Sequence, residues 1–135
     1  MRRLLATLAF DPAWQRVCHS SALVIYLLIV VLGSIPGARE EVGEFAPGVV
    51  LHSLAYAGLA LLLFVGGRGD RPARAIKSMT TIAAMGAFDE FVQSFFPYRT
   101  ASVWDWGVDV AAAALACSLL WSFWPELRSQ ASAGQ

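Results

Sequence analysis

The hydrophobic positions of this chain fall into four long runs, at about residues 17–35, 47–65, 75–96 and 103–124. A helix needs about 20 apolar residues to cross the hydrocarbon core of a bilayer, and each run approaches or reaches that length. Short segments rich in glycine, proline and charged residues separate the runs. The pattern therefore predicts an all-α membrane protein, a four-transmembrane-helix bundle.

The two ends of the chain are more polar than these runs. Residues 1–16 form a basic arm, in which Leu4–Phe10 is too short to span a bilayer and predicts an interfacial helix ended by Asp11-Pro12. Residues 17–125 form the four-span membrane domain, and residues 126–135 form a polar tail.

The basic residues indicate how the four spans are oriented. Only Arg39 and Arg99 fall on one side of a four-span arrangement. The other eight fall on the opposite side: Arg2, Arg3, Arg16, Arg68, Arg71, Arg74, Lys77 and Arg128. Cytoplasmic loops carry the excess of Lys and Arg, so both termini are predicted to be cytoplasmic.

Four carboxylates interrupt the third and fourth runs. These are Asp89, Glu90, Asp105 and Asp109. A carboxylate deep in hydrocarbon costs about 2.5–3.5 kcal/mol on insertion scales. We therefore expect these side chains to face one another, water or a ligand rather than lipid.

Helical geometry places several polar residues at one depth. Asp89 lies roughly 18 Å above Lys77, and Asp109 lies roughly 10 Å below the outer end of the fourth span. His52 and Tyr56 are at a similar depth and, four residues apart, share a helix face. The resulting predicted outer-leaflet site contains His52, Tyr56, Asp89, Glu90, Gln93, Asp105 and Asp109, beneath a loop that carries Arg99.

Some of these residues also have structural explanations. Ser102 and Asp105 have the spacing of a capping box, so Asp105 is explained as well by helix capping as by a ligand site. Capping does not explain Asp89 and Glu90, which lie near the C-terminal end of their helix, where the dipole opposes negative charge. Their side chains point about 100° apart, so we expect one to enter the site and the other to face a neighbouring helix or Arg99.

Composition supports membrane insertion and offers no sign of nucleic-acid binding. The chain is 57% hydrophobic, with a mean hydropathy of +0.57 and a formal net charge of zero. Cys18 and Cys117 have neither a CxxC nor a metal-binding spacing and are predicted to be small buried thiols.

The polar motifs of the second to fourth runs resemble the VanZ-like family of small bacterial membrane proteins. The resemblance rests on His52-x-x-x-Tyr56, Asp89-Glu90-x-x-Gln93, Phe-Phe-Pro-x-Arg99-Thr-Ala-Ser and Asp105-x-x-x-Asp109. Departures include Gly48-Val49 where the family often has Asp-Lys, Tyr98 where it usually has Gly, and Asp109 where it often has Asn. The resemblance implies a multi-pass protein of the bacterial inner (cytoplasmic) membrane and an association with resistance to the glycopeptide teicoplanin.

Three functions are compatible with a negatively charged outer vestibule, which attracts cations. The first is binding of a cell-envelope lipid, a lipid-linked intermediate or a glycopeptide headgroup through His52, Tyr56, Glu90, Gln93, Arg99, Asp105 and Asp109. The second is hydrolysis or group transfer on an envelope lipid, with His52, Asp89, Glu90 or Asp109 as catalytic residues or as ligands of a divalent cation. The third is a small cation or proton carrier.

Overall fold

The computed structural model describes residues 11–37, 48–98 and 102–124. These residues form four α-helices and no strand: α2 (Pro12–Gly33), α4 (Gly48–Gly66), α5 (Arg71–Gln93) and α6 (Val103–Phe123). The all-α prediction is confirmed. The predicted interfacial helix at Leu4–Phe10, Arg99 and the tail from residue 126 lie outside the described residues.

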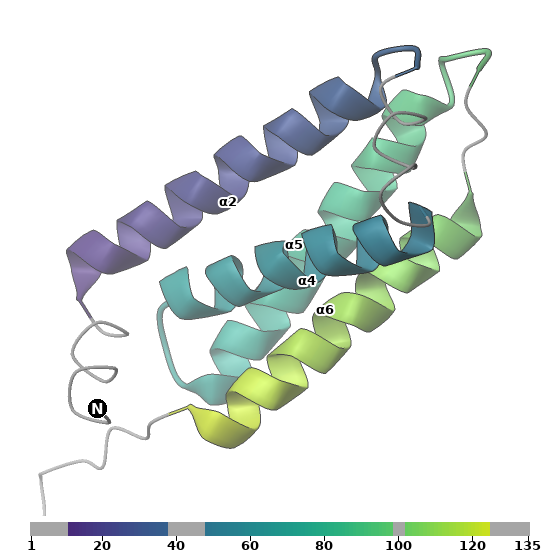
Figure 1. Ribbon diagram of the computed structural model, residues 1–135. Coiled ribbons are helices and arrows are strands. Elements are labelled where there is room, and N and C mark those ends of the chain that lie inside the picture. The colour runs from purple at the N-terminus through teal and green to yellow at the C-terminus, as the bar shows by residue number, and fades with distance from the viewer. Residues whose placement is uncertain (1–10, 38–47, 99–101, 125–135) are drawn as a thin grey trace, which may run out of the picture.

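Helix α4 is the centre of the bundle, because it packs against α2, α5 and α6. Figure 1 shows the beginning of α2, the α4–α5 turn and the end of α6 at one end of the molecule. We name this the basic end, for Arg16, Arg68, Arg71, Arg74 and Lys77. The opposite end holds Asp89, Glu90, Asp105 and Asp109 and is named the acidic end. All five described Lys and Arg residues lie at the basic end.

Two helices begin earlier than their apolar runs. Asp11 caps α2 by accepting a 2.8 Å hydrogen bond from the Ala13 N–H, and Asp70 caps α5 by accepting one from the Ala73 N–H at 3.0 Å. Each cap is followed by a proline in the first turn, where no N–H is needed. Asp11-Pro12 thus begins α2, while the helix that this pair was expected to end lies outside the described residues. The apolar runs did not include the first residues of α2 and α5, because the first turns of both helices contain polar or charged side chains.

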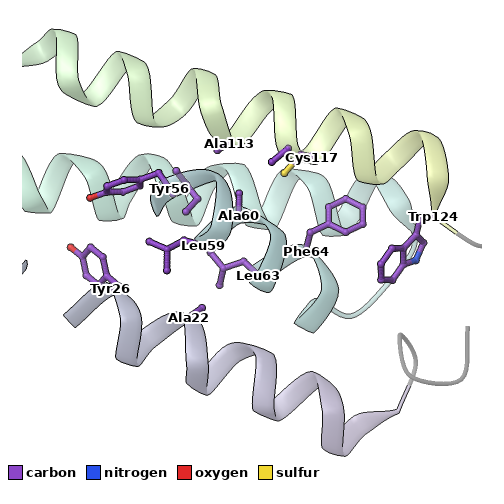
Figure 2. Close-up of a cluster of buried hydrophobic side chains, with 12 residues drawn as sticks. Ala22, Tyr26, Tyr56, Leu59, Ala60, Leu63, Phe64, Ala113, Cys117 and Trp124 are labelled. Atoms are coloured by element: carbon purple, nitrogen blue, oxygen red, sulfur yellow. The ribbon is translucent and has the colours of Figure 1, made fainter. Parts of the chain in front are cut away.

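The apolar core follows α4 (Figure 2). Leu59, Ala60 and Phe64 are almost completely buried against Ala22 of α2 and Ala113 of α6. The rings of Phe64 and Trp124 meet edge to face, with centroids 5.2 Å apart. Cys18 and Cys117 are buried free thiols, as predicted.

The bundle buries charge and exposes apolar side chains. Leu54 is 67% exposed, Leu115 64% and Phe95 69%, whereas Arg74, Asp89 and Asp109 are at most 2% exposed. Helices α2 and α6 are long and apolar enough to cross a membrane; the apolar part of α4 is shorter, and α5 does not meet the same criteria of length and hydropathy. A helical protein with two candidate membrane-spanning helices is thus established by length and composition.

The buried guanidinium of Arg74 holds the basic end together. Its Nη1 donates to the carbonyls of Phe64 (3.1 Å) and Val65 (3.0 Å), and its Nε donates to the carbonyl of Gly69 (2.9 Å). The guanidinium also lies 4.9 Å from the centre of the Trp124 ring. The last carbonyls of a helix have no partner within the helix, so Arg74 satisfies the C-terminus of α4.

Candidate binding site at the acidic end

A histidine–carboxylate pair joins α4 to α6. His52 Nδ1 lies 3.1 Å from Asp109 Oδ1 and donates to it in the tautomer protonated at Nδ1. Asp109 is 1% exposed, whereas the His52 side chain is 16% exposed. One turn along α4, the Tyr56 ring lies nearly parallel to the imidazole, with centroids 6.0 Å apart. The hydrogen bond therefore fixes the orientation of the imidazole, while part of the His52 side chain remains exposed.

The second buried carboxylate, Asp89, faces α4 from α5. The Tyr56 hydroxyl donates to Asp89 Oδ2 over 3.4 Å, a long hydrogen bond, and both side chains are at most 2% exposed. The Tyr26 hydroxyl of α2 donates to the Met85 carbonyl on the same helix as Asp89, at 2.9 Å. Figure 2 shows the hydroxyls of Tyr26 and Tyr56 at the same end of the core cluster. Three helices thus contribute polar groups near Asp89.

The Glu90 side chain points away from Asp89 and links α5 to Ser102, the residue directly before α6. Its Oε2 accepts a 2.5 Å hydrogen bond from the Ser102 N–H, while Ser102 Oγ accepts one from the Asp105 N–H at 3.3 Å. The predicted cap at Ser102 is confirmed, although a carboxylate of another helix supplies the reciprocal partner. The predicted division between Asp89 and Glu90 is also observed. Asp105 is half-buried in the first turn of α6.

Close contact between α5 and α6 depends on Gly86. A Cβ atom at this position would lie 3.1 Å from Trp106 Cδ1 and 3.2 Å from Asp109 Oδ2, closer than most real Cβ contacts. The indole Nε1 of Trp106 donates to the Ala83 carbonyl at 3.0 Å, one turn away. The missing side chain of Gly86 therefore allows Asp109 to lie against α5.

Four buried oxygen atoms of this region have no hydrogen-bond partner in the described part of the chain. They are Asp89 Oδ1, Glu90 Oε1, Gln93 Oε1 and Asp109 Oδ2. Gln93 follows Asp89 by one turn on the buried face of α5 and is 2% exposed. An unsatisfied buried acceptor costs about 1–3 kcal/mol, so four at one end of a small bundle require an explanation.

A cavity of about 270 Å³ lies between α5 and α6, and of the four residues above it is lined by Glu90 alone. Glu90, Ser102 and Trp106 contribute to its lining, with Ala87 and Val103. Within the described ranges, no group of three or more His, Cys, Asp or Glu side chains is placed to hold a metal ion. The candidate metal ligands His52, Asp89, Glu90 and Asp109 are thus not brought together as one coordination sphere.

The structure brings most of the predicted site residues to one end. His52, Tyr56, Asp89 and Asp109 are linked in two hydrogen-bonded pairs, and Glu90 is bonded to the N-cap of α6. Arg99 lies outside the described residues. Sequence reasoning missed the Tyr26 hydroxyl. For Tyr26, a phenol within an otherwise apolar run was an available signal.

Comparison with protein-family models, with characterised proteins and with solved structures finds no match for this chain. The VanZ-like resemblance therefore rests on the motifs quoted above.

Proposed function

We propose that this chain is a VanZ-like, multi-pass protein of the bacterial inner membrane, with both termini in the cytoplasm and the acidic end in the outer leaflet. The apolar exterior and the buried charges support this placement. The collection of all five described Lys and Arg residues at one end supports the orientation, since cytoplasmic ends carry the basic residues.

The acidic end binds a donor-rich headgroup of a cell-envelope lipid, a lipid-linked intermediate or a glycopeptide. The observation that carries this proposal is the set of four buried acceptor oxygens without partners in the described chain. Carboxylate and amide oxygens accept hydrogen bonds, so their complement is a ligand bearing ammonium, amide or hydroxyl donors. The negative charge of this end disfavours a bare phosphate. Binding of such a ligand contributes to resistance against antibiotics of the teicoplanin type.

A membrane-embedded hydrolase or transferase is a second candidate, favoured by the His52–Asp109 pair. A carboxylate bonded to one ring nitrogen fixes the tautomer and orientation of the imidazole. The other nitrogen, Nε2, is then the atom able to accept a proton from water or from a hydroxyl of an envelope lipid. The His52 side chain is partly exposed, as a general base requires.

The experiment compares Asp89→Asn and Asp109→Asn with the parent chain in detergent, using teicoplanin as the probe. We expect each variant to insert normally and to bind at least about tenfold more weakly, because charge-assisted hydrogen bonds contribute about 1.5–3 kcal/mol. Asp11→Asn is the matched control, since Asn caps a helix as well as Asp does. Teicoplanin susceptibility of cells expressing each chain is the second readout.

Three outcomes separate the candidates. Unchanged teicoplanin binding in both variants contradicts the binding proposal. Retained binding in His52→Gln, with loss of turnover of an envelope lipid, favours the enzyme. Reporter fusions after Gly69 and Gln135 test the orientation, and a periplasmic signal from either contradicts it.

A further inference from the structure

A second cavity, of about 400 Å³, opens at the basic end. Its wall comes from the first two turns of α2, the end of α4 and the early turns of α5. Gly66 makes this meeting possible, because a Cβ atom there would lie 2.6 Å from His19 Nδ1 and 3.0 Å from the Gln15 carbonyl. The cavity is therefore a product of close helix packing between α2 and α4.

The lining of this cavity is strongly positive. Arg16, Arg68 and Lys77 contribute three permanent cations from three different segments, and His19 lies beside them. Among the described residues, no carboxylate lines the cavity. The two described carboxylates of this end, Asp11 and Asp70, are exposed and cap their own helices. A cationic cavity of this kind complements a phosphate group.

We propose that this cavity binds the phosphate headgroup of an anionic phospholipid, of the phosphatidylglycerol type. Basic pockets between helices on the cytoplasmic side of membrane proteins bind such headgroups. Leu63 and Gly66 of α4 form an apolar part of the wall beside these cations. A volume of about 400 Å³ is within the range of small-ligand pockets. The inference uses the membrane placement proposed above but not the acidic site.

The test measures binding of short-chain phosphatidylglycerol to the full chain in a zwitterionic detergent, by native mass spectrometry and by thermal shift. Lys77→Gln should weaken binding about fivefold, and the double variant Arg16→Gln, Lys77→Gln roughly twenty-fivefold, since each basic residue near a membrane surface contributes a factor of about five. Arg16 and Lys77 are exposed, so the variants should unfold at the parent temperature without lipid. The affinity should also fall as salt is raised.

Arg71→Gln is the matched control, because it removes the same charge at the same end from a residue that does not line the cavity. It should change the affinity by less than about twofold. Equal binding of phosphatidylcholine of the same chain length would overturn the proposal. So would equal losses in Arg71→Gln and Lys77→Gln, or binding of inorganic phosphate as tight as that of the lipid. Teicoplanin binding by Lys77→Gln should equal that of the parent, so the two proposals fail separately.

Discussion

The two ends of the bundle satisfy their buried polar groups in opposite ways. At the basic end, the Arg74 guanidinium donates to three backbone carbonyls, and Lys77 Nζ donates to the Arg68 carbonyl at 3.3 Å. At the acidic end, four buried oxygens have no partner in the described chain. The basic end therefore stabilises the fold with its buried charge, whereas the acidic end retains hydrogen-bonding capacity for another molecule.

This difference has an energetic meaning. A buried polar group that is left unsatisfied costs about 1–3 kcal/mol, and a buried charge costs more. Removing the buried charge of Arg74 should thus lower the stability of the fold, whereas removing the buried charge of Asp89 should not impair folding. The predictions below test that contrast.

The largest expected effect is that of Arg74→Met. The substitution removes three hydrogen bonds and leaves carbonyls at the end of α4 buried without donors, so we expect a loss of about 3 kcal/mol or more in the free energy of unfolding. Reversible unfolding in mixed detergent micelles measures it. Lys77→Met is the control, since Lys77 is exposed, and it should change stability by less than about 0.5 kcal/mol. Equal losses of stability in the two variants would contradict a structural role for Arg74.

Gly86→Val should have an intermediate effect, at the acidic end. The new side chain would press on Asp109 and Trp106 and force α5 and α6 apart, at a cost of about 1–3 kcal/mol. Gly107→Ala on the facing helix is the matched control, because a Cβ atom there would have no described atom within 4 Å. That control should stabilise the chain by about 0.5–1 kcal/mol, the usual gain of alanine over glycine in a helix. A neutral Gly86→Val would mean that the helices do not approach as closely as described.

The smallest expected change in stability is that of Asp89→Asn. Asn keeps the shape and an acceptor for the Tyr56 hydroxyl but removes a buried charge that no described cation contacts. The free energy of unfolding should stay equal or rise by up to about 1 kcal/mol. A loss above about 1 kcal/mol, measured in the same micelles, would indicate that this carboxylate is paired in the native protein and serves the fold.

Local rules predicted a large part of the fold and of the candidate site. Capping geometry predicted the contact between Ser102 and the Asp105 N–H, and residue counting along helices brought His52 and Asp109 to one depth. The different directions of Asp89 and Glu90 followed from the step of about 100° between helical neighbours. These features depend on one helix at a time, or on depth alone.

The features that escaped prediction depend on how two helices meet. Arg74 was counted as a cytoplasmic loop cation, yet it is buried, because the end of α4 presents carbonyls at the right position. The Tyr26 hydroxyl also escaped prediction, because its acceptor, the Met85 carbonyl, lies on another helix. The spacing of residues within one segment does not reveal the hydrogen bonds of Arg74 or Tyr26, because both depend on how a neighbouring segment packs.

The low hydropathy of α5 bears on how the chain is made. In the proposed membrane placement, α2 and α6 are apolar enough to leave the translocon individually, while α5 carries Arg71, Arg74, Lys77, Asp89 and Glu90. Some of its buried polar groups find partners on α4, as in the bond from Ser78 to the Ala60 carbonyl at 2.9 Å. Helix α5 would therefore enter the bilayer as a hairpin with α4, held at the translocon until both have been synthesised. Biogenesis would then depend on the α4–α5 turn as much as on the hydrophobicity of any single helix.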